Sequence, residues 1–144
     1  MRDVDCVIID YLGLIQSAEK TENRVQEVTK ITKNLKMMAK DLNIPVVCCA
    51  QLSRNTEGRG KSHRPQLSDL RESGSIEQDA DIVLFLYREE YYSGEKDSES
   101  QDEIEPNKTE LIVAKNRHGE TGTVDLIFDS EFTRFRSVDN ARNY

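Results

Sequence analysis

The feature that most constrains the fold is a pair of short apolar runs separated by one amphipathic segment. Residues 4–9 form a near-continuous apolar run that ends at Asp10, and residues 45–50 form a second run. Runs of this kind are typical of strands buried on both faces of a sheet. Between them, residues 23–42 repeat apolar side chains at spacings of three and four, which predicts an amphipathic helix. A strand, a helix and a strand in this order predict a right-handed crossover and a parallel sheet.

The predicted helix has recognisable signals at both ends. Asn23 is a suitable N-cap residue, and Gln26 follows it three positions later, where a reciprocal capping side chain is common. Asn43 comes directly after the apolar stripe, and Pro45 prevents the helix from continuing. The stripe itself consists of Val25, Val28, Ile31, Leu35, Met38 and Leu42.

The middle of the chain changes character. Residues 54–66 contain two glycines and a proline among charged side chains, which predicts a long loop that is mobile over residues 54–64. A short helix is expected from Ser68 to about Asp79, with Ser68 as its cap. Residues 82–86 form a third apolar run and predict a third buried strand.

The remaining residues predict an antiparallel extension. Residues 109–114 and 122–128 are expected to form a β-hairpin, followed by a short edge strand at residues 132–135. The acidic, serine-rich residues 89–107 are expected to be a flexible insertion. Residues 139–144 are expected to be a polar tail behind one domain that spans residues 1–138. The expected architecture is therefore α/β, with three parallel buried strands and an antiparallel hairpin that extends the sheet.

Charge is distributed unevenly along the 144 residues. The net charge is −7, a value unusual for a protein that binds nucleic acid. Residues 88–105 hold eight acidic and two basic side chains and so carry −6 of that total, whereas residues 54–64 hold four basic and one acidic side chain and carry +3. The local distribution matters more than the sum. The three cysteines lack CxxC spacing and lie in apolar stretches, which predicts buried, reduced thiols in a cytoplasmic protein.

Three polar residues stand where ligands bind in open parallel sheets, beyond the carboxyl ends of the strands. Asp10 follows the first predicted strand, Gln51 the second and Arg88 the third. An aspartate in this place can orient Mg²⁺ through its waters, as in a Walker B strand. Each residue alone is equally compatible with a solvated strand end. His63 and His118 have no partner at ligand spacing, so we assign no metal to histidine.

Four segments in a fixed order make the pattern specific. These are Ile8–Ile15, Ala50–Arg54, Arg64–Asp81 and Lys115–Gly119. Together they resemble the DnaB family of replicative DNA helicases, over nearly the whole chain from Val4 to Val138. The resemblance implies a partial RecA-like P-loop NTPase fold, namely the C-terminal part of the motor domain.

The resemblance also implies roles for single residues. Asp10 matches the Walker B carboxylate that acts on Mg²⁺, and Gln51 matches the glutamine that couples the γ-phosphate to the DNA loops. Lys115 and Arg117 match a basic pair that reaches the ATP site of the neighbouring subunit, with Arg117 as the arginine finger. The residues that match the loop gripping the single-strand backbone are Arg71, Glu72 and Gly74. The basic residues that match a second channel-facing loop are Arg54, Arg59, Lys61 and Arg64.

The resemblance extends to partners, cofactors and location. It implies single-stranded DNA and neighbouring subunits of a homo-hexamer as partners, and it makes a primase and a helicase loader further candidates, with no membrane. The parent protein would use ATP and Mg²⁺ for 5′→3′ unwinding at the replication fork, in the bacterial cytoplasm at the nucleoid. Two departures from the family pattern are Gly13, where glutamine is common, and Cys49-Ala50, where a small-polar pair is usual.

A missing motif qualifies the expected activity. The sequence Gly-x-x-x-x-Gly-Lys-Ser/Thr, whose loop cradles phosphates, does not occur in the chain. We therefore expect this chain alone neither to bind nucleotide tightly nor to hydrolyse ATP. Two other interpretations stay open at this point. The chain could be part of another RecA-like ATPase, such as a recombinase or clock ATPase, or a non-catalytic module that docks onto helicase rings.

Overall fold

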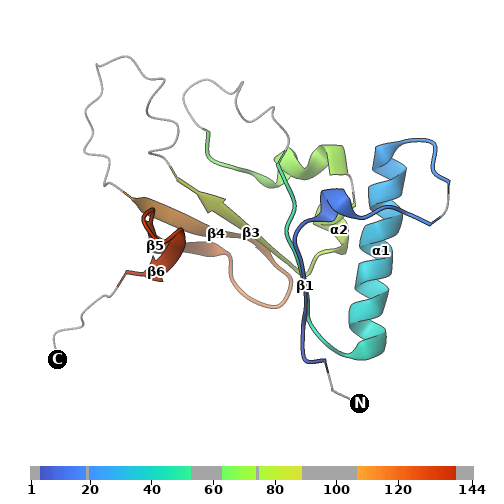
Figure 1. Cartoon of the computed structure of the whole chain (residues 1–144), viewed down its shortest axis with the longest axis horizontal. Helices are drawn as coiled ribbons and strands as arrows, with labels where there is room; N and C mark the ends of the chain where they lie inside the picture. The colour runs from blue at the N-terminus through green and yellow to red at the C-terminus, as the bar shows by residue number, and fades with distance from the viewer. Residues whose placement is uncertain (1–3, 19, 53–62, 74, 89–106, 139–144) are drawn as a thin grey trace. The chain divides into compact units, whose positions relative to one another are not determined.

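The computed structural model describes residues 4–18, 20–52, 63–73, 75–88 and 107–138, without the side chains of residues 71–73. The chain divides into two compact units (Figure 1), which are treated separately below. The first unit comprises residues 1–58 and 66–80, and the second comprises residues 59–65 and 81–144. The expected insertion at residues 89–107 and the tail at 139–144 lie outside the described residues, except for Asn107.

The first unit contains the expected crossover. Strand β1 (Val7–Ile9) pairs in parallel with strand β2 (Val46–Cys48), and helix α1 (Arg24–Leu42) connects them. The side-chain oxygen of Asn23 accepts a hydrogen bond from the Gln26 amide at 2.9 Å, which satisfies a free donor of the first turn. Asn43 ends the helix in the left-handed conformation, with φ 52°. The predicted strand–helix–strand order, the parallel pairing and both helix ends are confirmed.

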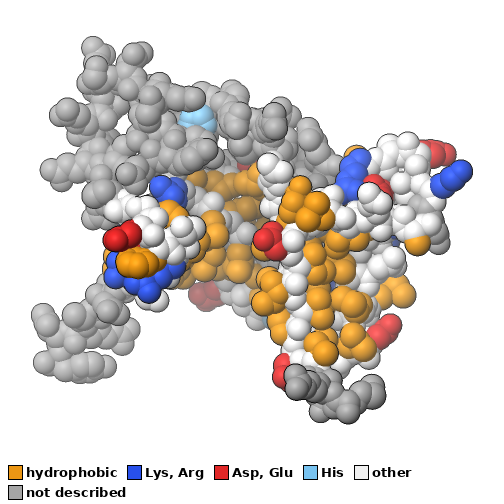
Figure 2. Space-filling model, viewed as in Figure 1, with side chains coloured by type: hydrophobic (Ala, Val, Ile, Leu, Met, Phe, Trp, Pro, Cys, Tyr) orange, Lys and Arg blue, Asp and Glu red, His pale blue; other side chains and the backbone are white. Residues whose placement is uncertain are grey.

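One face of the β1–β2 pair is covered and the other is open. The core of the first unit consists of Leu12, Val28 and Ile31, with Cys48 and Leu35 packed against it. On the opposite face Ile8 is 73% exposed and Val47 is 51% exposed. Hydrophobic side chains accordingly gather over β1 in Figure 2. The expectation that these strands are buried on both faces is wrong, because α1 covers only one side of the pair.

The three cysteine side chains also differ in their exposure to solvent. All three cysteines are free, as expected for reduced thiols, but Cys6 and Cys49 are exposed and only Cys48 is half-buried. The expectation of buried thiols is therefore wrong, since an apolar neighbourhood in the sequence did not specify which face each side chain occupies. Burial raises the pKa of the Cys48 thiol, and the neighbouring Cys49 raises it further.

The predicted helix from Ser68 to Asp79 is wrong as a single element. The chain instead forms a 3₁₀ helix, η3 (Leu67–Ser73), and a short helix, α2 (Ile76–Asp79). Leu67 and Leu70 are three residues apart, and Leu70 is buried, which suits the threefold repeat of a 3₁₀ helix. A second 3₁₀ turn, η1 (Leu12–Leu14), follows β1 and contributes Leu12 to the core.

The second unit is an antiparallel sheet in the order β3-β4-β5-β6. Its strands are β3 (Ile82–Tyr87), β4 (Lys108–Asn116), β5 (Gly122–Asp129) and β6 (Arg134–Ser137). The predicted hairpin and edge strand are confirmed, with slightly different bounds. The expectation that residues 82–86 form a third parallel strand is wrong, because β3 pairs antiparallel with β4. An apolar run specifies a strand but does not specify the direction of its partner.

Burial in β3 alternates along the strand. Val83 and Phe85 are buried, whereas Ile82, Leu84 and Leu86 are each more than half exposed. This alternation is typical of an antiparallel strand with one covered face. Among the described residues, no helix is both long enough and apolar enough to span a membrane.

Candidate functional site

The carboxyl edge of the β1–β2 pair brings two of the expected residues together. The strands are in register from Val7 opposite Val46 to Ile9 opposite Cys48. Two backbone hydrogen bonds continue beyond the paired residues. The Cys49 amide donates to the Ile9 carbonyl at 2.9 Å, and the Leu12 amide donates to the Cys49 carbonyl at 2.9 Å. Asp10 follows β1 at this edge, and Gln51 follows β2 three residues beyond its end; both are exposed.

The Asp10 carboxylate is available to a ligand. It is exposed, and no other described residue forms an ion pair or hydrogen bond with it. A single carboxylate on a strand end suits Mg²⁺, which keeps most of its waters and takes one or two protein carboxylates. Nowhere in the described ranges do three or more His, Cys, Asp or Glu side chains gather to hold a metal ion. Asp10 therefore fits a magnesium ion that depends on water and phosphate for its other ligands.

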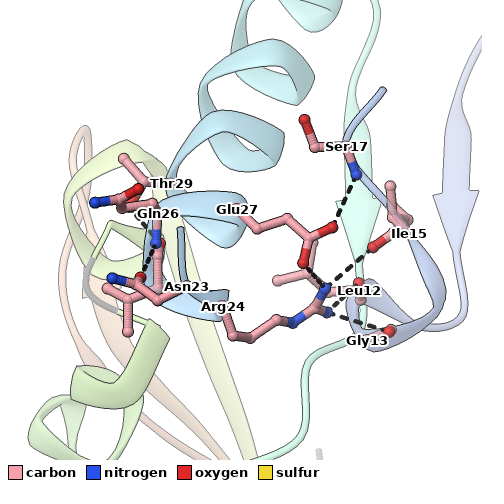
Figure 3. Close-up of polar contacts among 10 residues, drawn as sticks. Leu12, Gly13, Ile15, Ser17, Asn23, Arg24, Gln26, Glu27 and Thr29 are labelled. Atoms are coloured by element: carbon pink, nitrogen blue, oxygen red, sulfur yellow. Dashed lines mark hydrogen bonds and ion pairs between the residues drawn. The ribbon is translucent and has the colours of Figure 1, made fainter. Parts of the chain in front are cut away.

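An arginine on α1 holds the segment that follows Asp10 (Figure 3). The Arg24 guanidinium donates hydrogen bonds to the carbonyl oxygens of Gly13 at 3.1 Å, Ile15 at 3.3 Å and Leu12 at 3.5 Å. These carbonyls belong to η1 and the residue after it. These hydrogen bonds fasten the first turn of α1 to the segment that follows Asp10 in the sequence.

Glu27 completes this contact from the same turn of the helix. Its carboxylate forms an ion pair with Arg24 at 2.7 Å and accepts a hydrogen bond from the Ser17 amide at 3.0 Å. The Ser17 amide, followed by the Arg24 guanidinium, lowers the pKa of Glu27 below its ordinary value of 4.5. The charged form of Glu27 is therefore the one that holds Ser17.

This geometry predicts a pH dependence of the segment after β1. Because the folded-state pKa of Glu27 is lowered, its contribution is complete above pH 4.5 and is lost as the pH falls through the lower, folded value. A titration followed by the Ser17 amide proton in NMR should therefore have its midpoint below 4.5. Substitution of Arg24 by Gln should move the midpoint upward. A midpoint at or above 4.5 in the unmodified chain would contradict the observed contact.

The segment from Gln66 to Asp79 has an internal contact at its start and a contact with α1 at its end. At its start, the Asp69 carboxylate accepts a hydrogen bond from the Gln66 amide at 2.7 Å, and Asp69 is buried. At its end, the Thr32 hydroxyl lies 2.8 Å from the Ser75 hydroxyl and donates to Asp79 at 2.6 Å. Arg71 and Glu72 lie between these contacts on η3, with side chains outside the described set; Gly74 lies outside it entirely.

Lys115 and Arg117 lie at the end of β4 in the second unit. The Arg117 amide donates to the Asp81 carbonyl at 2.9 Å, which fixes the backbone there. The Arg117 guanidinium forms an ion pair with the Asp81 carboxylate at 3.4 Å, and both side chains are nearly half exposed. Exposed ion pairs contribute about 0–1 kcal/mol, so this pair is easily exchanged for a stronger anion.

Two other expected residues have contacts inside the second unit. Arg64 forms an ion pair with Glu110 and donates a hydrogen bond to the Thr123 hydroxyl at 3.2 Å. Arg88, at the end of β3, places its guanidinium 4.4 Å from the centre of the Phe128 ring. Arg88 therefore stacks on the sheet to which it belongs. Arg54, Arg59 and Lys61 lie outside the described residues.

Sequence reasoning did not single out Thr32 or Arg24. Thr32 had a usable signal, because it follows Val28 by four positions and so places a hydroxyl on the stripe that α1 buries. Arg24 had no such signal, since an arginine in the first turn of a helix is ordinarily solvated. Its role depends on where the chain after β1 runs, which no local pattern specifies.

Comparison with known proteins identifies the family. Residues 1–137 match the family model described as the DnaB-like helicase C terminal domain. The chain belongs to the DnaB-like helicase C-terminal domain family. This membership sets aside the alternative of a recombinase or clock ATPase. It also agrees with the α/β fold and with the order of the four segments that carried the resemblance.

Individual relatives of this DnaB-family chain are similar over almost all of it. It is 49% identical over 147 residues to the replicative DNA helicase DnaB of Rickettsia bellii and 51% identical over 134 residues to that of Geobacillus stearothermophilus. The alignments cover 92% of this chain and 29% and 28% of those proteins. The chain therefore spans less than a third of the length of these relatives.

Solved structures give the same result. One solved ATPase domain matches with a TM-score of 0.82 at 44% identity, covering 93% of this chain and 44% of that one. A DnaB-like replicative helicase, described together with its interactions with primase, matches with a TM-score of 0.82 at 45% identity, covering 93% of this chain and 30% of that one. The DnaB-family chain thus has part of a RecA-like helicase ATPase fold.

One departure from the family pattern has a local explanation. Gly13 stands where the resemblance implies glutamine. A Cβ atom added at Gly13 would lie 2.3 Å from Cε2 of the Tyr11 ring, so any larger residue requires that ring to move. Tyr11 is 37% exposed, which leaves room for such a movement. Gly13 therefore allows the ring position seen here, while its carbonyl still accepts from Arg24.

Proposed function

We propose that the chain acts as the C-terminal part of the motor of a replicative DNA helicase, which couples ATP hydrolysis to unwinding of duplex DNA. The observation that carries the proposal is the shared edge of β1 and β2, where Asp10 and Gln51 lie exposed in a chain that matches helicase ATPase domains over 93% of its length. Parallel strands present ligands beyond this edge.

Asp10 and Gln51 act on the nucleotide side in this proposal. Bound Mg²⁺ would neutralise charge on the phosphates of ATP. Asp10 would orient that ion through water, and the exposure of its carboxylate, with which no other described residue pairs, supports this role. Gln51, exposed at the same edge, would sense the terminal phosphate and couple it to the DNA-binding residues. The backbone hydrogen bonds between Ile9, Cys49 and Leu12 join the two strand ends, which supports a role for Asp10 and Gln51 at one site.

Lys115 and Arg117 serve a neighbouring subunit in this proposal. An arginine finger must be able to leave its resting partner for a phosphoryl group, and the ion pair of Arg117 with Asp81 is exposed and weak enough for that. The Asp81 carbonyl holds the Arg117 backbone while the side chain is able to exchange partners. A ring of identical subunits, the homo-hexamer, would supply the neighbouring site.

DNA is the proposed ligand of the segment from Gln66 to Asp79. Arg71, Glu72 and Gly74 would grip the single-strand backbone, with a second basic loop formed by Arg54, Arg59, Lys61 and Arg64. The intrachain contacts of Arg64 with Glu110 and Thr123 would have to be exchanged for phosphate in that state. Primase is proposed as a further partner, since a structural relative is described with primase. A helicase loader is proposed on the family resemblance alone. Such a protein would act in the bacterial cytoplasm at the nucleoid.

The same proposal predicts that the isolated chain does not turn over ATP. The chain contains no Gly-x-x-x-x-Gly-Lys-Ser/Thr loop to hold the phosphates, and one exposed carboxylate does not replace it. Phosphate release by the purified chain should therefore equal that of buffer with ATP and Mg²⁺, and tight nucleotide binding should be absent in calorimetry. The matched control is Asp10→Ala. Turnover that this substitution abolishes would contradict the prediction.

A further inference from the structure

The anchor at the end of the 66–79 segment is made by a residue outside that segment. Thr32 lies in the middle of α1, is 8% exposed, and its hydroxyl contacts Ser75 at 2.8 Å and Asp79 at 2.6 Å. Ser75 is 6% exposed, so both hydroxyls are closed to water, whereas Asp79 is half-buried. Buried hydroxyls that meet a carboxylate form strong, directional contacts.

The distances within this group favour one arrangement of its protons. A threonine hydroxyl carries a single proton, and the Asp79 carboxylate at 2.6 Å is a closer acceptor for it than the Thr29 carbonyl at 3.2 Å. The Ser75 hydroxyl then donates to the Thr32 oxygen, which accepts. This also explains why Ser75 precedes α2 without capping it through its side chain. Ser75 thus donates to Thr32, and Thr32 donates to the Asp79 carboxylate, the final acceptor.

The position of the group indicates what it holds in place. Ser75 comes directly after the residues proposed to grip DNA, and Asp79 is the last residue of α2. At the other end of the segment, Asp69 holds Gln66 within the segment itself. Thr32 therefore supplies a polar contact that fastens the carboxyl end of the segment to a long helix, beside the apolar packing of Ile76 against the core. At the N-terminus of the same helix, Arg24 donates a hydrogen bond to the carbonyl of Gly13, in the segment that follows Asp10.

We propose that Thr32 is a positioning residue for the DNA-binding segment, holding Ser75 and Asp79 on α1 so that Arg71 and Glu72 are presented to DNA from a fixed backbone. This rests on the DNA-binding role proposed above. Because α1 also carries Arg24, the same helix supports the residues that follow Asp10 and the residues from Ser75 to Asp79. Residues that touch no ligand often set the precision of a binding site in this way.

Amide hydrogen exchange on the 144-residue chain tests the local effect. Thr32→Val keeps the shape of the side chain and removes the hydroxyl, and Ser75→Ala removes the other hydroxyl. Each should speed exchange in residues 67–79 by on the order of tenfold or more, while amides of β4 and β5 are unchanged. Thr32→Ser should restore slow exchange. The matched control is Thr29→Val, since the Thr29 hydroxyl donates to the Val25 carbonyl within α1, at 2.8 Å.

Binding of a fluorescent oligo(dT) to the same variants tests the functional effect. Thr32→Val should weaken binding as Arg71→Ala does but leave the salt dependence unchanged, because no phosphate contact is removed. Unchanged exchange in residues 67–79 in both Thr32→Val and Ser75→Ala would overturn the positioning role. Faster exchange throughout the chain would overturn it as well, since that indicates only a loss of global stability. If Arg71→Ala binds as the unmodified chain does, the DNA-binding proposal fails, while the exchange result still decides the role of Thr32.

Discussion

Replacement of Arg117 by alanine in an intact helicase ring that carries this chain is expected to abolish ATP hydrolysis and to leave nucleotide binding largely intact. A suitable host is the DnaB of Geobacillus stearothermophilus with its corresponding segment exchanged for this chain, to which it is 51% identical. An arginine finger acts on charge that develops in the transition state, so its loss typically costs on the order of 10³-fold or more in rate. Steady-state phosphate release and binding of a fluorescent nucleotide measure the two quantities.

The controls for this prediction separate a lost finger from a damaged sheet. Arg134 lies on β6 of the same unit and forms its ion pair with Asp129, so Arg134→Ala should retain hydrolysis. In rings mixed from Arg117→Ala and unmodified subunits, hydrolysis should return only at sites that receive an unmodified Arg117. Loss of nucleotide binding by Arg117→Ala would show that the residue holds the ground state, contrary to the assignment.

Replacement of Arg71 by alanine in the same host is expected to weaken binding of single-stranded DNA by on the order of tenfold, because a charge-assisted phosphate contact is lost. The slope of the logarithm of affinity against the logarithm of salt concentration should fall by about 0.7 for each phosphate contact removed. Hydrolysis without DNA should remain nearly unchanged, since Arg71 on η3 is assigned to DNA and not to the nucleotide.

Two variants make the Arg71 result specific. Arg71→Lys keeps the charge and should preserve most of the salt dependence, although the planar fork of the guanidinium is lost. Lys33→Ala removes an exposed cation from α1 in the same unit and should leave both the affinity and the salt slope unchanged. Equal DNA affinity for Arg71→Ala and the unmodified protein would disprove the assignment of this residue.

The elements with strong local signals could be predicted from the sequence. The stripe, Asn23 and Asn43 specified α1 to within a residue, because periodicity and caps are encoded locally. The β1–β2 pairing followed from the crossover rule, and the hairpin from its two apolar runs and intervening turn. The family followed chiefly from one segment, Arg64–Asp81, and the comparisons confirmed it.

What could not be predicted depends on neighbours that are distant in the sequence. The direction of β3 is set by β4, more than twenty residues later, and the burial of Ile8 is set by what covers the far face of β1. Thr32 contacts Ser75 and Asp79, from which it is separated in sequence by 43 and 47 positions. The only signal for this anchor was therefore a polar side chain on a buried stripe. Site roles for Asp10, Gln51 and Arg117 stay predictions that the experiments above address.

Unwinding of a forked DNA duplex by the exchanged helicase tests most directly whether this chain is a working part of a replicative motor. The ring that carries the chain in place of the corresponding Geobacillus stearothermophilus segment should unwind the fork in the presence of ATP and Mg²⁺, and its Asp10→Asn variant should not. A ring that assembles and binds both nucleotide and DNA but does not unwind the fork would contradict the account.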